Sequence, residues 1–242
     1  MNNTCERLSN MNSSTATSPL ERYAYNLTRL ARQGMLSPLI GYDRLVTRIF
    51  DVLLRKAKST RSYNPLLLDE DEMGRTRVIL EVVRRMALGN APEPLPSLQV
   101  IAPNFDMLCV PSSIMTSQEV PRNDPEAEVE KLTHLLSWPP SDSWNTLDIL
   151  LSRFEAFFSV VQHTADPTLL VLNDFHRLIS QEPWPSAVNL FSLLVPALAR
   201  REIQFLGTST LTHYRSSIER LAPIQIRVQG LVRRSDEALQ QK

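Results

Sequence analysis

The chain has 242 residues, 43% of them hydrophobic, and its formal net charge at pH 7 is zero. This composition allows a sizeable buried core, and a neutral chain has no overall electrostatic attraction for nucleic acid or an anionic membrane. Its two cysteines, Cys5 and Cys109, are too few for a disulfide framework, and no apolar run has the length of a membrane span. We therefore expect a cytoplasmic protein whose partners include neither nucleic acid nor membrane.

The first third of the chain predicts a leader and two helices. Residues 1–18 are polar and rich in Ser, Thr and Asn, so we expect them to be disordered. Apolar side chains then recur every three or four residues from residue 20, a helical spacing that ends at Gly34. A link over residues 35–43 leads to a second predicted helix with one broad apolar face and a basic end.

The rest of the chain alternates between short apolar runs and helical patterns. The runs predict buried strands at residues 66–68, 98–101, 169–172, 203–206 and 224–228. The helical patterns cover residues 75–88, from 147, 186–200 and 211–221. Such alternation predicts an α/β fold, a three-layer sandwich in which helices cover both faces of a mostly parallel five-stranded sheet.

The domain boundaries follow from the same patterns. We predict one α/β domain over residues 19–230 and a polar tail at residues 231–242. Within the domain, residues 110–146 are rich in Pro, Ser, Asp and Asn, which indicates a long loop or insertion. Ligands of such sheets bind beyond the carboxyl ends of the strands, so candidate site residues should follow the predicted strands.

Residues 69–76, after the first predicted strand, have the frame of a phosphate-binding P-loop. That motif is Gly, four residues, Gly, Lys and then Ser or Thr, in which the Lys reaches the outer phosphates and the hydroxyl holds Mg²⁺. Gly74 and Thr76 are in place here, whereas Asp69 stands at the first glycine and Arg75 at the Lys. Taken alone, these residues favour a solvated acidic turn that caps a helix N-terminus.

The third predicted strand ends in Asn173 and Asp174, where a Walker B strand carries two carboxylates. The first carboxylate orients Mg²⁺ through water and the second polarises the attacking water. Only Asp174 is a carboxylate here, and shifting the register by one residue places Phe175 second. By itself this pair is equally compatible with an Asx turn at the end of a strand.

Other stretches place these motifs in a family. Three stretches resemble the first nucleotide-binding domain of the Clp chaperones and unfoldases. They are residues 20–41, which end in Ile40-Gly41, residues 64–68, and above all residues 196–219, which contain Gly207-Thr208-Ser209-Thr210-Leu211. The resemblance covers about residues 20–105 and 147–230. It implies the large subdomain of an AAA+ ATPase, a P-loop NTPase-like fold with Gly74 and Asn173 at the ends of adjacent strands.

The resemblance also implies a role for each matching position. Nucleotide-binding positions fall on Ile40, Gly41, Gly74, Arg75 and Thr76, of which Thr76 would be the Mg²⁺ ligand. Catalytic positions fall on Asn173 and Asp174 as Walker B, Ser209 as sensor one and Arg227 as a candidate arginine finger that reaches a neighbouring subunit's ATP.

Several positions depart from the family pattern. The first of the family's two finger arginines is Ile226 here, and Tyr42 replaces a basic residue. Residues 110–146 stand where the aromatic pore loop is expected, with Trp144 as a loose candidate, and we expect no counterpart of the family's helical lid after Arg227. The acidic P-loop would also repel a nucleotide, since each like-charge pair costs roughly 2–4 kcal/mol at an effective dielectric of ~20.

These departures predict a degenerate site that binds ATP and Mg²⁺ weakly or not at all. We therefore expect a hydrolysis-defective member of a protein-remodelling system that acts by binding other proteins, such as intact AAA+ subunits, and an oligomer is compatible with this role. The alternative is a weakly active ATP hydrolase or ATP-dependent regulator in which Arg75 and Asp174 still suffice.

Overall fold

The computed structural model describes residues 23–58, 63–70, 72–110, 136–138, 147–164, 166–179 and 191–232. The predicted leader, most of the predicted insertion, including Trp144, and residues 233–242 of the predicted tail lie outside these residues. Those predictions therefore stay predictions.

Within these described residues, six strands form a single sheet in the order β1-β3-β4-β5-β2-β6. The strands are β1 (Ala24–Asn26), β2 (Asn64–Leu68), β3 (Gln99–Pro103), β4 (Thr168–Leu172), β5 (Gln204–Ser209) and β6 (Val228–Val232). Only β1 is antiparallel, paired with β3, and all other neighbours are parallel. The predicted α/β class with a mostly parallel sheet is confirmed, and the sheet has one strand more than the predicted five.

The extra strand lies within the first predicted helix. β1 pairs with β3, and Ala24 lies opposite Pro103. Helix α2 (Leu27–Arg32) starts only after Asn26, whose side chain accepts a hydrogen bond from the N–H of Arg29 and so caps the helix. The helix ends as predicted near Gly34, which has a φ of 77°.

The predicted strand at residues 224–228 is wrong by four residues. This segment begins with a short helical turn, α10 (Ala222–Gln225), and Val228 starts β6 opposite Asn64. Ile224 is buried in the core, but Ile226 is 45% exposed, so the two isoleucines do not share the face of one strand. The apolar spacing over residues 224–228 therefore belongs to a helical turn whose Ile224 packs in the core and to the first residue of β6.

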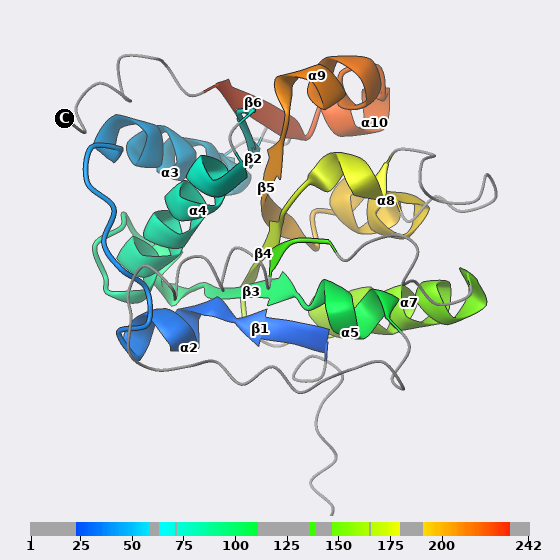
Figure 1. Cartoon of the computed structure of the whole chain (residues 1–242), viewed down its shortest axis with the longest axis horizontal. Coiled ribbons are helices and arrows are strands. Elements are labelled where there is room, and N and C mark those ends of the chain that lie inside the picture. Colours follow the sequence, from blue (N-terminus) through cyan, green and yellow to red (C-terminus); the bar gives the residue numbers. More distant parts are fainter. Residues whose placement is uncertain are drawn as a thin grey trace, which may run out of the picture.

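Helices cover both faces of the sheet, as the three-layer prediction requires (Figure 1). On one face lie α2, α3 (Asp43–Lys58) and α4 (Glu72–Ala87). On the other lie α5 (Phe105–Cys109), α7 (Leu147–His163) and α8 (Phe191–Ala199). Side chains of β2 alternate between the two layers, since Leu66 and Leu68 join one buried cluster and Leu67 joins the other.

Short turns complete the fold. They are η1 (Leu95–Ser97), η3 (Phe175–Leu178), α9 (Leu211–His213) and a π-helical turn, η4 (Tyr214–Ile218). The last two occupy most of the segment predicted as a helix over residues 211–221. Within the described part of the chain, no helix is both long and apolar enough to cross a membrane.

The strand order corrects one sequence expectation. Gly74 follows β2 and Asn173 follows β4, but β5 lies between these two strands, so they are not neighbours. Both residues still reach the same edge of the sheet, because β2, β5 and β4 run parallel.

Candidate functional site

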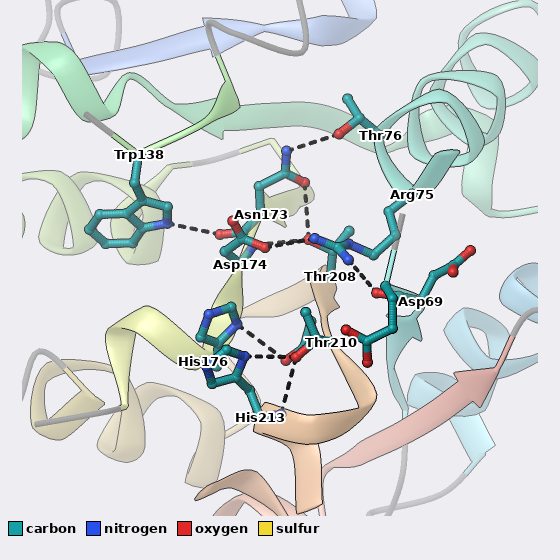
Figure 2. Close-up of polar contacts among 12 residues, drawn as sticks. Asp69, Arg75, Thr76, Trp138, Asn173, Asp174, His176, Thr208, Thr210 and His213 are labelled. Carbon is teal, nitrogen blue, oxygen red and sulfur yellow. Dashed lines mark hydrogen bonds and ion pairs between the residues drawn. The ribbon is translucent and has the colours of Figure 1, made fainter. Parts of the chain in front are cut away.

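The polar site lies where the carboxyl ends of β2, β5 and β4 meet (Figure 2). Asp69 follows β2, Asn173 follows β4, and Ser209 is the last residue of β5. Helix α4 begins at Glu72, so Gly74 lies within its first turn and Arg75 and Thr76 project from its start. The topology thus brings the P-loop and Walker B positions together.

Arg75 is the centre of this site. Its side chain is only 4% exposed, and Nη2 lies 3.1 Å from Oδ1 of Asp174, whose side chain is 12% exposed. Its Nη1 donates a hydrogen bond to the backbone carbonyl of Asp69 (Figure 2). The guanidinium therefore links the end of β2 directly to the end of β4.

The backbone of Asp174 directs its carboxylate toward this arginine. Asp174 has a φ of 45°, in the left-handed region that few non-glycine residues adopt. Its N–H donates to Oγ1 of Thr208 on β5 at 2.9 Å, a contact that helps hold the strained turn. Aspartate tolerates this conformation better than most residues.

Asn173 links three parts of the site. Its amide Nδ2 donates to Oγ1 of Thr76 at 3.4 Å, and Oγ1 of Thr208 donates to its Oδ1 at 3.4 Å. Its backbone carbonyl accepts from Nε1 of Trp138 at 3.0 Å, and the Trp138 ring stacks 3.9 Å from that of Phe105. The amide thus contacts the hydroxyl at the predicted Mg²⁺ position.

Trp138 is not among the site residues that the sequence predicts, because the surrounding residues read as a loop or insertion. The ring is 7% exposed and belongs to the same core cluster as Phe154 and Phe105. A weak signal was present, because Leu132, Leu135, Leu136 and Trp138 place several large apolar residues close together in a Pro-rich stretch.

Ser209, the predicted sensor-one residue, contacts a histidine. Its Oγ lies 3.2 Å from Nδ1 of His176, and the His176 ring stacks 4.0 Å from the ring of His213. Burial, and next the neighbouring His213, Arg177 and Arg75, lower the pKa of His176 to about 3. His176 is therefore neutral at physiological pH and hydrogen-bonds as an uncharged imidazole.

Neither histidine was singled out from the sequence, because the four histidines of the chain share no ligand spacing. Across the described ranges, no group of three or more His, Cys, Asp or Glu side chains is arranged to hold a metal ion. Of the stacked pair, His176 contacts Ser209 and His213 contacts Thr210.

The remaining predicted positions lie outside these contacts. Ile40 is 82% exposed in the link between α2 and α3, and Gly41 beside it has a φ of 90°. Arg227 precedes β6, and its carbonyl accepts from the N–H of Asn64 at 3.1 Å. Because Asn64 begins β2, Arg227 lies at the opposite end of that strand from Arg75.

Curated proteins with similar sequences are Clp chaperones. The chain is 26% identical to the mitochondrial chaperone ClpB4 of Arabidopsis thaliana over 227 residues, which are 94% of this chain and 20% of ClpB4. It is 29% identical to ClpB of Brucella suis over 210 residues, 87% of this chain and 20% of that protein. The chain thus spans about a fifth of the length of these relatives, and no family model matches it.

Solved structures show the same fold. The Hsp104-ADP complex of S. cerevisiae superposes with a TM-score of 0.63 at 21% identity, over 88% of this chain and 30% of that one. An extended Hsp104:casein complex of S. cerevisiae gives a TM-score of 0.62 at 21% identity, over 88% of this chain and 30% of the other. Over most of its length, this chain thus has Clp-type AAA+ chaperones as its relatives, and its fold is that of the Hsp104 structures, consistent with a Clp-type AAA+ domain.

Proposed function

We propose that this chain is a Clp-type AAA+ domain that does not hydrolyse ATP and acts by binding other proteins. The observation that carries the proposal is the buried ion pair between Arg75 and Asp174. In an active P-loop ATPase the corresponding basic residue reaches the nucleotide phosphates, and the Walker B carboxylates serve Mg²⁺ and the attacking water. Here the two groups neutralise each other.

The residues as placed do not fit a bound magnesium nucleotide. To reach a phosphate, Arg75 would have to leave both Asp174 and the Asp69 carbonyl, and the mostly buried Asp174 carboxylate would lose its cation. Removing one partner of a buried ion pair is strongly unfavourable, typically by about 3–5 kcal/mol. The phosphate contacts together would therefore have to offset the free energy lost with the ion pair before they could stabilise a bound nucleotide.

The Mg²⁺ position points the same way. The Thr76 hydroxyl accepts a hydrogen bond from the amide of Asn173, and that amide carries no charge with which to orient a hydrated cation. Mg²⁺ prefers carboxylate, carbonyl and phosphate oxygens. An uncharged Asn173 thus supports the proposal that metal-assisted phosphoryl transfer is lost.

The protein-binding part of the proposal rests on what the relatives are and on exposed apolar side chains. Casein was present in a solved structure of Hsp104, and the sequence relatives are chaperones. On this chain Ile40 is 82% exposed and Ile226 is 45% exposed, next to the candidate finger Arg227. We propose intact AAA+ subunits as partners, which would cover these side chains in a mixed oligomer.

The experiment is sedimentation velocity of the chain with intact ClpB, with and without Mg·ATPγS, alongside ATP turnover of the chain alone. We expect co-sedimentation that Ile226→Asp weakens and that Ile149→Asp, a change of another exposed isoleucine on α7, leaves intact. Independent sedimentation of the two proteins would overturn the partner. Turnover by the chain alone would favour the alternative, a weakly active ATPase or ATP-dependent regulator.

We also propose a cytoplasmic location. Cys109 is a free buried thiol whose pKa is raised by burial, as expected of a structural cysteine in a reducing compartment. The sequence relatives include a mitochondrial ClpB4 and a chloroplastic ClpC. Fluorescence imaging of the tagged chain against organelle markers is therefore the direct test.

A further inference from the structure

A cavity of about 550 Å³ lies at the end of the sheet opposite the Arg75–Asp174 pair. Gln204, the first residue of β5, lines this cavity, whereas Ser209 at the other end of β5 contacts His176. The volume lies within the range of small-molecule sites in proteins.

The walls of the cavity are mostly apolar. Leu53 and Leu54 come from α3, Leu95 comes from η1, and Leu98 precedes β3. Leu53 and Leu95 are buried in the core, so these walls are fixed by packing. The hydrocarbon or aromatic body of a ligand would be stabilised here, because its apolar surface would leave water and make dispersion contacts with these walls.

Two cations stand at this apolar cavity without a partner carboxylate. Lys56 and Arg201 both line it, and neither makes an ion pair with any residue that the structure describes. Burial, and next the charge of Arg201, lower the pKa of Lys56. The neighbouring Arg200 differs, because its guanidinium is paired with Glu202 at 2.9 Å.

The guanidinium of Arg201 is held in position but not satisfied. Nη2 donates to the backbone carbonyl of Lys56, and the guanidinium carbon lies 5.6 Å from the centre of the Tyr63 ring. Nε is buried and has no hydrogen-bond partner within the described part of the chain. A guanidinium held in this way, with no carboxylate partner among the described residues, is suited to the carboxylate of a ligand.

The backbone at Arg201 gives a second reason to assign it a role. Arg201 has a φ of 63° and ends helix α8: its N–H bonds to the carbonyl of Leu198, and the N–H of Glu202 bonds to that of Ala197. This is the helix end at which glycine is usual, because other residues are strained in the left-handed region. Arg201 therefore has a strained backbone conformation, and its position places a positive charge at the cavity.

We propose that this cavity binds a single carboxylate attached to an apolar body, with the carboxylate at Lys56 and Arg201 and the apolar part against Leu54 and Leu98. Two sources share this chemistry: a free organic acid, and the C-terminal carboxylate of a polypeptide that ends in an apolar residue. Apolar walls disfavour a polyanion such as a nucleotide, whose many charges would stay uncompensated.

The test is a binding titration of the full chain by isothermal calorimetry with two probes, sodium octanoate and the peptide acetyl-Ala-Ala-Leu with a free carboxylate. The controls are octanol and the same peptide as its C-terminal amide, which lack the charge. Arg201→Gly is the main variant because glycine relieves the left-handed strain, so the fold should survive the loss of the cation. Lys56→Gln and Ala57→Trp, which fills the exposed side of the cavity, are independent second variants.

We expect one of the two acids to bind saturably and both uncharged controls to bind at least tenfold more weakly. Arg201→Gly and Lys56→Gln should each weaken binding by about tenfold or more, with an unchanged circular dichroism spectrum. Lys58→Gln, on the same helix but outside the cavity, should bind as the wild type does. Binding of octanoate alone identifies a free acid as the source, and binding of the peptide alone identifies a C-terminus. No saturable binding of either acid, or equal binding of octanol, would overturn the proposal.

Discussion

The guanidinium of Arg75, at the start of α4, lies 3.1 Å from the carboxylate of Asp174, at the end of β4. This contact joins the two segments that in the Clp family hold a nucleotide between them. A strand, β5, separates β4 from β2 in the sheet, so the ion pair spans the width of the site from one strand end to the other.

Breaking this pair should destabilise the fold. Asp174→Asn keeps the shape of the side chain and tolerates the left-handed backbone, but leaves the buried charge of Arg75 uncompensated, which should cost about 3–5 kcal/mol. Urea unfolding followed by circular dichroism measures the change. Asp43→Asn is the matched control, because the Asp43 carboxylate is 73% exposed beside Arg85 and should contribute less than about 1 kcal/mol.

A double variant separates the charge from the geometry. Arg75→Met with Asp174→Asn removes both charges and should recover much of the lost stability, since a buried pair and an apolar replacement are often equivalent. Equal losses in Asp174→Asn and Asp43→Asn would contradict a buried, mutually dependent pair.

We predict no affinity for Mg·ATP tighter than the high micromolar range. The arginine at the phosphate position is already bound to Asp174 and to the Asp69 carbonyl, and Asp69 adds an acidic side chain where the motif has glycine. Isothermal titration at low salt is the measurement, since low ionic strength exposes the electrostatics most fully. A micromolar or tighter dissociation constant would contradict the prediction.

The class of fold could be read from the sequence, but the order of the strands could not. The run Leu169-Leu170-Val171-Leu172 is bounded by Pro167 and Asn173, so β4 was evident from apolar length and breakers. The strand at residues 24–26 could not be predicted because Tyr23 and Leu27 fit a helical spacing, whereas its pairing with β3 is a long-range contact. Strand order depends on long-range pairing that no local pattern encodes.

The site was predictable as a meeting of loops but not as an ion pair. The positions of Arg75, Asn173 and Asp174 followed from the family resemblance and from where parallel strands end. Their contacts depend on tertiary detail: Asp174 takes its left-handed turn beside Thr208, and Trp138 arrives from a segment without a periodic pattern. His176 is buried by packing, which the sequence spacing of histidines does not report.

His176 should make stability depend on pH in mildly acidic solution. Its pKa is about 3 in the folded chain against an ordinary value of 6.5, so below pH 6.5 the unfolded state binds a proton that the folded state does not. The free energy of unfolding should therefore fall as pH drops from 6.5 toward 3, by up to about 1.4 kcal/mol per pH unit from this group.

Urea unfolding at several pH values tests this dependence with two variants. His176→Gln keeps a polar contact for Ser209 and should flatten the slope below pH 6.5, while His163→Gln, on the outer surface of α7, should not. The charged or titratable groups that face His176 are His213, Arg177 and Arg75, and all three disfavour its protonation. An identical slope in wild type and His176→Gln would show that another group carries the pH dependence.

ATP turnover separates the inactive domain from the weakly active alternative most sharply. The wild-type chain should show no phosphate release above a buffer blank in a coupled assay, even when concentrated enough to favour assembly. Arg75→Lys alone should stay inactive, because the acidic Asp69 remains and the lysine can still pair with Asp174. Asn173→Asp alone should also stay inactive, because it adds a carboxylate for Mg²⁺ while Arg75 remains bound within the chain.

Restoring both residues should still give little activity. Active-site groups act as a unit, so their effects are not additive, and Ile226 stands in place of one arginine of the family's finger pair. Turnover in the wild type that Asp174→Ala abolishes would overturn the hydrolysis-defective proposal, because it would mean that Arg75 exchanges its internal partner for a phosphate. Turnover that survives Asp174→Ala would instead indicate a contaminating ATPase. A second purification step should then remove the turnover when the assay of the variant is repeated.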